Sequence, residues 1–421
     1  MTLQLEDPKL SPPPALQRCG SNRVVTRAPV GAAQATPSRI MLLISSLEHG
    51  GAERQVTQLA NHVDEKRFDL TVCSLSNHVP LAKELRDWER RLVIVPRRGR
   101  FNAGVVWRVA RVMKQRQIDL VHCFLFDAEM IGRLAARIAG VCAVVASERN
   151  ADYQRPRLHS WCLRLTRSWF DVMIANSEAG KRFNMRTQDL PAERIHVIRN
   201  GVDIHRFHPV GRMRLRALMG IPFDAPVVGM IANFKPQKRY EDFFRVAATV
   251  LRRFPRAFFV VVGEPLRDNL QGAEDYHAEI RKLVRSLGIE PRCRFLSQRN
   301  DMPDVYGLCD VTVLTSSREG TPNVLLESMA CGVPVVATDV ADNAYLVPGG
   351  DVGCIVNVGD VQETAERVCH LLGDPRKRRD RGKAAREWVV REFSSAALAR
   401  KTEKVYTDLL ESKRRRGEKP A

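Results

Sequence analysis

The chain has 421 residues, of which 44% are hydrophobic and 27% are charged, a composition typical of a soluble globular protein. This length exceeds what one hydrophobic core usually organises, so two domains are expected. The longest apolar runs, such as residues 258–263, have the length of a strand. They fall far short of the ~20 residues that span a bilayer, so no transmembrane helix is predicted.

Ten cysteines are scattered along the chain without a C-x-x-C pair, and several fall inside apolar runs. This spacing favours reduced thiols in the core of a cytosolic protein. It argues against a disulfide framework or a zinc site.

The formal net charge of +19 suits three kinds of partner: nucleic acid, an anionic membrane surface, or phosphorylated small substrates. Basic residues cluster at 97–116 and 149–167 with aromatic residues between them. Such segments are typical of a helix resting on anionic headgroups, and a solvated charged face with a few buried aromatics is the alternative. We expect a cytoplasmic protein that is peripheral on the inner face of the plasma membrane. No known nucleic-acid-binding module is present, so no specific nucleic acid partner is expected.

Residues 1–37 are rich in Pro, Ala, Ser and Gln and have no apolar period, which predicts a disordered tail. The tail lacks the apolar core of a signal peptide, and Glu6 and Asp7 argue against a transit peptide.

A first domain is predicted over residues 38–205. Its first strand, 39–45, leads at once into Gly50 and Gly51, which allow a backbone to approach a ligand closely. An ordinary turn before a helix would explain the two glycines equally well. Apolar runs that alternate with helical patterns predict a mainly parallel sheet covered by helices. Further strands are expected at 68–75, 91–95, 119–124, 143–147, 171–176 and 194–198, and helices at 52–61, 103–117, 128–139 and 157–170.

The pattern restarts after a linker at 207–216, which predicts a second domain of the same kind over residues 206–393. The predicted fold class is therefore α/β, with two Rossmann-like domains facing across a cleft. A last element, 394–411, is expected to be a helix that crosses back to the first domain, followed by a basic disordered tail at 412–421. Strands of the second domain are expected at 227–232, 257–263, 292–296, 311–314, 334–337 and 354–358.

Residues 233–239, NFKPQKR, leave the first strand of the second domain and enter a helix. Lys235, Lys238 and Arg239 are therefore expected at the carboxyl edge of that sheet, where ligands of such folds bind. Lysines there could neutralise a phosphate leaving group, and the alternative is that they are ordinary loop cations.

Residues 311–340 read as a strand, a polar loop, a helix and a second strand, which together form a βαβ unit. Thr321 is predicted to cap the helix with Pro322 as its first residue. Two acids, Glu319 and Glu327, mark the unit. They could face a ligand at the helix N-terminus, or they could be a first-turn acid and a solvated helix residue.

Several motifs together resemble the retaining glycosyltransferases of family 4, which have the GT-B fold. The motifs are GGAER at 50–54, NGVD at 200–203, FKPQK at 234–238 and EGTPNVLLESMACGVPVVAT at 319–338. The last is similar to the long E-x7-E signature of that family almost position by position, and the resemblance runs from about residue 39 to 411.

The resemblance implies a nucleotide-diphosphate-sugar donor held mostly by the second domain, with no other cofactor. Glu319 would bind sugar hydroxyls, Glu327 the ribose, and Lys238 the departing diphosphate. The backbone of Gly320, Thr321, Pro322, Asn323 and Val324 would lie against sugar and diphosphate, and Gly50 and Gly51 would let the first domain close over them. The sequence has no D-x-D triplet, so no metal is expected and the charge must be stabilised by cations and helix amides.

Two positions depart from the family pattern. Asn233 stands where an arginine is common, so Lys235 is the candidate for a second donor cation. Arg149 stands where many members carry a histidine, and an arginine can bind phosphate but is a poor general base. His122 is an alternative catalytic candidate near the same cleft edge, although a polar strand-end histidine without a catalytic role explains it better.

The predicted function is transfer of a sugar from a nucleotide-diphosphate donor to a saccharide or polyprenyl-linked acceptor, with retention of anomeric configuration. The resemblance favours a role in cell-surface polysaccharide or lipopolysaccharide biosynthesis. Lys238, Glu319 and Arg149 are the candidates for the catalytic groups. A nucleotide-sugar epimerase on the same fold and an inactive transferase-like binding protein are the alternatives, the second motivated by Arg149 and Asn233.

Overall fold

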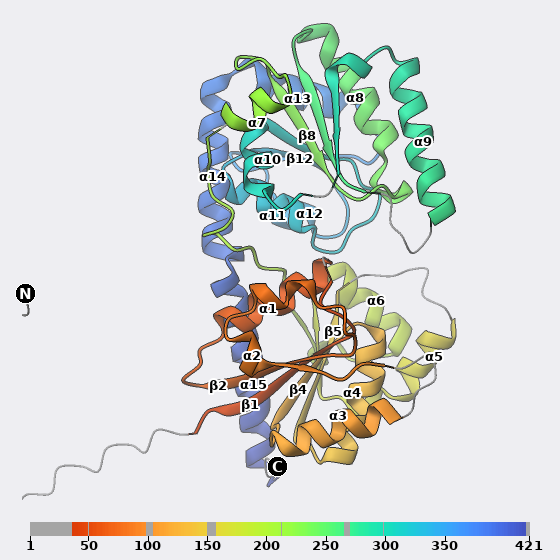
Figure 1. Ribbon diagram of the computed structural model, residues 1–421, viewed down its shortest axis with the longest axis vertical. Helices are drawn as coiled ribbons and strands as arrows, with labels where there is room; N and C mark the ends of the chain where they lie inside the picture. The colour runs from red at the N-terminus through yellow and green to blue at the C-terminus, as the bar shows by residue number, and fades with distance from the viewer. Residues whose placement is uncertain are drawn as a thin grey trace, which may run out of the picture. The chain divides into compact units, whose positions relative to one another are not determined.

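The computed structural model describes residues 36–48, 50–97, 104–149, 157–211, 213–264, 270–297 and 299–417 (Figure 1). The disorder predicted for the tail at 1–35, and for 418–421 at the other end, concerns residues outside these ranges.

The first sheet contains seven parallel strands in the order β3-β2-β1-β4-β5-β6-β7 (Figure 1). Parallel strands that helices cover on both sides have apolar side chains on both faces, which is why each appeared in the sequence as a continuous apolar run. In β1, Ile40 and Leu42 join one core cluster while Met41 and Leu43 join the other. The strands are β1 (Ser38–Ile44), β2 (Phe68–Ser74), β3 (Leu92–Ile94), β4 (Leu120–Phe124), β5 (Ala143–Glu148), β6 (Val172–Ala175) and β7 (Ile195–Val197).

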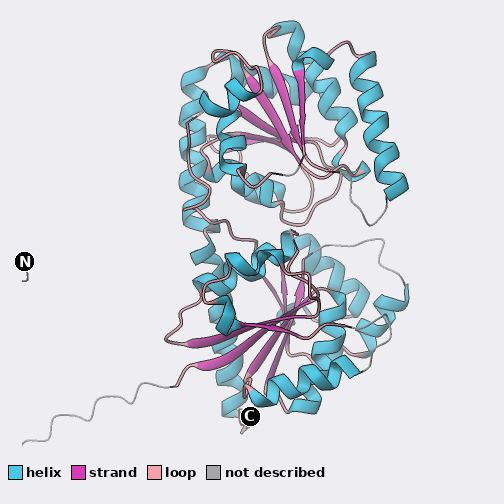
Figure 2. Cartoon of the chain, in the orientation of Figure 1, coloured by secondary structure: helices cyan, strands magenta, loops and turns pink. Residues whose placement is uncertain are grey.

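Helices cover both faces of this sheet (Figure 2). Val56 and Leu59 of the first helix pack on one face, and Val109 and Met113 of a later helix pack on the other. The elements are α1 (Gly51–His62), η1 (Pro80–Glu84), α2 (Trp88–Arg91), α3 (Gly104–Gln115), α4 (Phe126–Ala139), α5 (Arg157–Leu165), η2 (Arg167–Trp169), α6 (Glu178–Gln188) and η3 (Ala192–Arg194).

The second sheet contains six parallel strands in the order β10-β9-β8-β11-β12-β13. Two parallel α/β sheets with covering helices confirm the predicted fold class, and each strand range expected from the sequence overlaps an observed strand. The strands are β8 (Val227–Ile231), β9 (Phe258–Val262), β10 (Cys293–Leu296), β11 (Val311–Leu314), β12 (Val335–Thr338) and β13 (Gly353–Val356). Around them lie α7 (Met213–Leu218), η4 (Pro236–Lys238), α8 (Tyr240–Arg253), α9 (Leu270–Ser286), η6 (Glu290–Arg292), α10 (Met302–Leu308), α11 (Asn323–Ala330), α12 (Asn343–Leu346), α13 (Val361–Gly373) and α14 (Pro375–Phe393).

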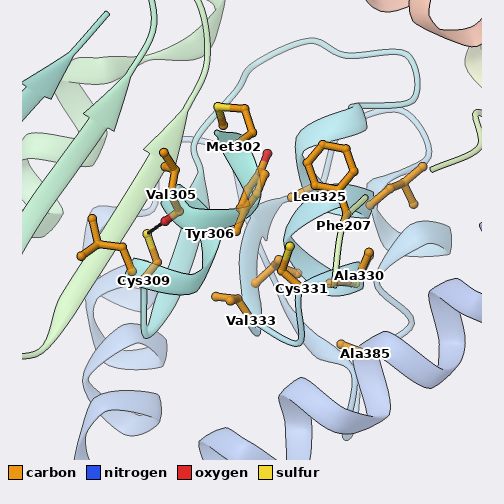
Figure 3. Packing of buried hydrophobic residues seen from close by; sticks show 14 of the residues in the cluster. Phe207, Met302, Val305, Tyr306, Cys309, Leu325, Ala330, Cys331, Val333 and Ala385 are labelled. Atoms are coloured by element: carbon orange, nitrogen blue, oxygen red, sulfur yellow. Dashed lines mark hydrogen bonds between the residues drawn. The ribbon is translucent and has the colours of Figure 1, made fainter. Parts of the chain in front are cut away.

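Tyr306 sits in the core cluster that packs α10 beside α11 (Figure 3). Its ring meets that of Phe207 edge-on with centroids 6.0 Å apart. Leu325 and Ala330 of α11 belong to the same cluster. This packing fixes the first turns of α11 relative to the sheet, which matters because the candidate site is built on those turns.

The last helix, α15 (Ser395–Arg415), returns to the first sheet, as predicted (Figure 1). Its Ser394 cap accepts a hydrogen bond from the Ala397 amide, and the side chain of Tyr406 is buried against Phe68. The helix continues past the predicted end at 411. The predicted disordered tail is therefore wrong for residues 412–415, where Lys413 forms an ion pair of 2.8 Å with Asp171.

The predicted linker at 207–216 is wrong in its second half, which begins α7. Arg216 is 2% exposed, pairs with Asp310 at 3.2 Å and donates to the carbonyl groups of Pro222, Phe223 and Ala225. Arginines in a sequence usually predict exposure to solvent. Arg216 is buried because the buried Asp310 compensates its charge.

Six of the nine cysteines in the described ranges are buried, as their apolar surroundings predicted. Across the same ranges, no helix combines the length and the apolar character that crossing a bilayer requires.

Candidate active site

A cavity of about 630 Å³ opens where the carboxyl ends of strands from both sheets meet. Leu125, Arg149 and Asn176 follow β4, β5 and β6, while Ala232 and Gly263 follow β8 and β9. Ligands of open α/β sheets bind at this edge. Every site residue predicted from the sequence lines the cavity: Gly50, Gly51, Arg149, Asn233, Lys235, Lys238, Glu319, Gly320, Thr321, Pro322, Asn323, Val324 and Glu327.

The loop before α11 brings backbone amides to the cavity wall. The predicted cap is wrong by one residue, because α11 begins at Asn323 with Pro322 as its cap. Thr321 lies one residue before the cap, and its hydroxyl group donates to the backbone carbonyl of Asn176 in the first half of the chain. The cap therefore uses no side chain, and the first-turn amides of α11 lie beside the cavity with the positive end of the helix dipole.

Lys238 and Glu319 form an ion pair of 2.5 Å in the cavity wall. Their side chains are 16% and 8% exposed, so the pair is largely shielded from water. The Ser317 amide donates to the Gln237 carbonyl at 2.8 Å, and the Thr315 hydroxyl donates to the Lys238 carbonyl at 2.9 Å. These bonds hold the β8 and β11 loops together, which fixes the two charged groups in position.

Glu327 lies on the second turn of α11, and its Oε2 accepts a hydrogen bond of 2.8 Å from the Tyr306 hydroxyl. Burial raises the pKa of the Glu327 carboxyl, while the nearby Arg54 guanidinium and the Tyr306 bond act in the opposite direction. Burial and the same carboxylate raise the pKa of Tyr306 well above its usual range.

Asn323 links the two halves of the chain through its side-chain oxygen. Asn200 Nδ2 donates to Asn323 Oδ1 at 2.8 Å and to the Thr321 carbonyl at 3.0 Å. Gln55 exchanges two hydrogen bonds with the backbone of Gly201, at 2.7 and 2.9 Å, which holds that turn against α1. The loop at 320–324, which is predicted to bind the donor, is therefore held by amide side chains of the first domain.

The Gly50 and Gly51 pair begins α1 at the cavity. A Cβ atom on Gly50 would lie 2.0 Å from Glu53 Oε2, and one on Gly51 would lie 3.5 Å from Asn323 Nδ2. The Glu53 side chain thus folds over the first glycine, and the second faces the opposite half of the chain. Burial is the largest effect on Glu53 and raises the pKa of its carboxyl.

Arg149 follows β5 and is 7% exposed. Its Nη1 donates to Asn200 Oδ1 at 3.3 Å, and its Cζ lies 5.0 Å from the centre of the Phe124 ring. Burial lowers the pKa of the guanidinium to about 10, which leaves it protonated at neutral pH. The backbone carbonyl of Arg149 accepts from Asn176 Nδ2 at 2.9 Å.

His122 lies within β4 and is not at a strand end, contrary to the prediction. It is completely buried, its Nδ1 lies 2.7 Å from the Tyr406 hydroxyl, and it does not contribute to the cavity wall. Burial and the Arg149 charge hold the pKa of His122 well below its usual range, so the ring is neutral.

Several residues in the cavity wall were not predicted from the sequence. Asn176 and Asn200 in the wall, and Gln55 of α1 outside it, act through side-chain amides, which no charge or strand pattern distinguishes from ordinary polar residues. Arg54 and Asn200 belong to the motifs GGAER and NGVD, so the sequence pointed to both, but neither was predicted as a site residue. The other unpredicted residues in the wall include Glu53, Gln237, Arg299 and Met302.

Comparisons with known proteins identify the family. Residues 214–388 match the family model described as Glycosyl transferases group 1, and residues 49–206 match Glycosyltransferase Family 4. The D-inositol 3-phosphate glycosyltransferase 2 of Catenulispora acidiphila is 32% identical over 330 residues, which are 75% of this chain and 76% of the relative. The N-acetyl-alpha-D-glucosaminyl L-malate synthase of Bacillus anthracis is 27% identical over 321 residues, which are 74% of this chain and 80% of that protein.

Among solved structures, HepE of Anabaena in complex with UDP superposes with a TM-score of 0.77 at 23% identity, covering 88% of this chain and all of that one. Sucrose-phosphate synthase of Thermosynechococcus elongatus superposes with a TM-score of 0.72 at 20% identity, covering 89% of this chain and 100% of that chain. The chain belongs to glycosyltransferase family 4 and has the GT-B fold. It is a glycosyltransferase, as the sequence motifs predicted.

Proposed function

We propose that this enzyme transfers a sugar from a nucleotide-diphosphate donor to a saccharide or lipid-linked glycan acceptor with retention of anomeric configuration. One observation carries the proposal: Lys238, Glu319 and the first-turn amides of α11 line one cavity. A cation and a helix N-terminus suit a diphosphate, and a carboxylate suits sugar hydroxyls. Solved relatives in the fold comparison contain UDP or UDP-glucose, which supports the donor class.

In this proposal the second domain holds the donor. Glu327 would accept hydrogen bonds from the ribose, Glu319 would accept them from the sugar, and Lys238 would move from Glu319 to the diphosphate. Lys235 would supply a second positive charge to the diphosphate, because Asn233, which stands where an arginine is common in the family, is neutral. The backbone of 320–324 and the close approach at Gly50 and Gly51 would enclose the diphosphate. Positioning and charge stabilisation would then lower the barrier without a covalent intermediate.

In the chemical step, the bond between the anomeric carbon and the diphosphate oxygen breaks, with its electron pair leaving on the oxygen. The acceptor oxygen bonds to the anomeric carbon from the same face, and its proton passes to that departing oxygen. This step needs no protein base, so the replacement of a histidine by Arg149 is compatible with catalysis. Lys238 would stabilise the charge as it develops.

The donor can be identified by thermal unfolding with UDP, GDP, ADP and their sugars, because a ligand that binds only the folded state raises the melting temperature. Mass spectrometry of transfer onto cell extract and NMR of the new linkage would then identify the product and its anomeric configuration. A donor that emerges epimerised without transfer would support an epimerase, and an inverted linkage would contradict retention. Binding without turnover on any acceptor would support an inactive transferase-like protein.

We also propose that the enzyme acts at an anionic membrane surface, on the cytoplasmic side, in the biosynthesis of a cell-surface polysaccharide or lipopolysaccharide. A relative from Escherichia coli, 24% identical over 72% of this chain and 79% of its own length, is named for an acceptor on diphosphoundecaprenol. An acceptor of that kind would lie in the membrane.

The outward face of α5 supports this location. Leu158, Trp161 and Leu165 are 66%, 60% and 58% exposed, and their spacing places them on one side of the helix, away from the buried Leu163. From Tyr153 to Phe170 the sequence has four arginines and no acid. An exposed apolar face in a segment of this basic composition is complementary to an anionic bilayer, although Arg167 pairs with Asp189 at 2.5 Å.

Cosedimentation with phosphatidylcholine vesicles, with and without phosphatidylglycerol, tests the surface. We expect binding only to the anionic vesicles and its loss in Trp161→Glu. Trp88→Glu is the matched control, because Trp88 is also exposed, at 43%, but lies on α2. Equal loss in both variants, or binding that persists in Trp161→Glu, would refute this surface.

A further inference from the structure

Arg149 differs from the other buried arginines in the described residues. Arg133 pairs with Glu129 at 2.6 Å, Arg216 pairs with Asp310 at 3.2 Å, and Arg91 pairs with Glu65. Arg149 has no carboxylate partner within the described part of the chain, although its neighbour Glu148 is also buried. Glu148 is the last residue of β5, Arg149 follows it, and the Glu148 carboxylate accepts a hydrogen bond from Asn184 Nδ2 at 3.0 Å.

The hydrogen bonds of the Arg149 guanidinium are also incomplete. One of its five N–H groups donates to a described residue, Asn200 at 3.3 Å. An uncompensated charge inside a protein costs free energy unless a ligand supplies the opposite charge. Arg149 lines the cavity, so an anionic ligand can reach it.

Asn176 presents a second unsatisfied group in the same wall. It is 2% exposed, its Nδ2 is used by the Arg149 carbonyl, and its Oδ1 has no partner among the described residues. A Cβ atom on Gly320 would lie 3.3 Å from that oxygen, so Asn176 borders the donor loop. The wall thus offers a cationic donor for a phosphoryl group and a neutral acceptor for a hydroxyl group.

We propose that Arg149 anchors a phosphoryl-binding subsite for the acceptor, which is therefore a phosphorylated or diphosphate-linked saccharide. This inference rests on the proposed sugar transfer and adds the charge of the acceptor to it. Arg149 and Asn176 follow strands of the first sheet, whereas Lys235 and Lys238 follow β8 of the second sheet and serve the donor diphosphate in the proposed function. A guanidinium fork suits phosphate, and the Asn200 contact orients it.

Inorganic pyrophosphate is a suitable probe, measured by thermal unfolding and by calorimetry at constant ionic strength, with and without saturating UDP or GDP. The wild type should bind pyrophosphate at a site that remains available when the nucleoside diphosphate is bound. Arg149→Met should weaken that binding by about tenfold to a hundredfold, the effect of losing a charge-assisted contact. Arg256→Met is the matched control for lost charge, because Arg256 is exposed and pairs with the exposed Asp224.

Three outcomes would overturn the inference. If saturating nucleotide competes with pyrophosphate, Arg149 belongs to the donor site. If Arg149→Met binds pyrophosphate as the wild type does, Arg149 is not part of an anion site. If Arg256→Met weakens binding equally, the effect is one of general charge. If neither UDP nor GDP nor a donor sugar binds, the proposed sugar transfer fails instead. The measurement without nucleotide would still decide whether Arg149 binds phosphoryl groups.

Discussion

Lys238 Nζ lies 2.5 Å from Glu319 Oε1, although the two residues are 81 positions apart in the chain. They meet because β8 and β11 are neighbours in the second sheet and each is followed by a loop at the same edge. The enclosed pair means that a donor must separate or share these charges when it enters. Electrostatic preorganisation of this kind is usually the largest contribution to catalysis.

Removing either member of that pair should slow sugar transfer far more than it affects folding. For Lys238→Ala and Glu319→Ala we expect turnover to fall by about a hundredfold to a thousandfold, since each removes a group aimed at the developing charge or at the sugar. Initial rates of donor hydrolysis and of transfer, with far-UV circular dichroism to verify folding, provide the measurement. Near-normal rates in both variants would refute the assignment.

Glu327 should make stability depend on pH. Burial raises its pKa above the ordinary value of 4.5, so the folded state holds this proton more tightly than the unfolded chain. The contribution of Glu327 to the free energy of unfolding therefore falls as pH rises from near 4.5 through the raised pKa, and stays low above it. A tenfold difference in proton affinity corresponds to about 1.4 kcal/mol.

Glu327→Gln should remove this part of the pH dependence and be more stable than the wild type at neutral pH, because its amide oxygen can still accept from Tyr306. Urea unfolding across the window tests this. Glu387→Gln is the control, since that side chain is 66% exposed on α14. If the curves of Glu327→Gln and the wild type run parallel, the carboxylate does not carry the effect.

Asn200→Ala should impair the closed arrangement of the cavity. It removes the donor to Asn323 Oδ1 and to the Thr321 carbonyl, and also the acceptor for Arg149. We expect kcat/KM to fall by about tenfold or more, in line with three lost hydrogen bonds of roughly 0.5–1 kcal/mol each, while far-UV circular dichroism is unchanged. Asn61→Ala is the comparison, because Asn61 bonds the Glu84 carbonyl and the Arg86 amide within the first domain. Equal losses in both variants would show that the cross-domain bonds are unimportant.

Two buried arginines should respond in opposite ways to the same substitution. Arg216→Met leaves Asp310 with one fewer cation in the core, and we expect a loss of about 3–5 kcal/mol in the free energy of unfolding. Arg149→Met removes a charge without a carboxylate partner among the described residues, so the ligand-free protein should keep or gain stability. Chemical unfolding of both variants without phosphate measures this contrast. Equal destabilisation would mean that Arg149 has a structural role.

The sequence was sufficient for the sheets because buried parallel strands are continuous apolar runs, as in Phe258–Val262, and this signal is local. The βαβ unit at 311–340 was likewise visible because its apolar runs, polar loop and helical pattern are local, whereas the E-x7-E signature was found through the family resemblance. Local patterns also explain the errors. Thr321 looks like a helix cap, but α11 begins two residues later, and the Thr321 hydroxyl donates to the carbonyl of Asn176, a residue 145 positions away.

Contacts between distant residues account for the rest. A charged residue in a sequence predicts exposure, so Arg216 could be placed inside only by knowing that Asp310 lies beside it. His122 looked like an edge residue because its partner, Tyr406, is supplied by the last helix. The predicted cavity residues do line the cavity, but the Lys238 and Glu319 bond depends on β8 and β11 being neighbours in one sheet, and the Asn200 contacts depend on how the two halves pack.

The Val202 bridge to Ser394 brings together the two places where the chain passes between its halves. The Ser395 amide donates to the Val202 carbonyl at 2.9 Å, so the outgoing and returning segments are bonded to each other. Two bonded crossings connect the halves at a single place. A bend there would move Asn200 only slightly, because Asn200 is two residues before Val202. We therefore expect the enzyme to admit substrates and release products by bending at this connection, next to the Asn200 contacts.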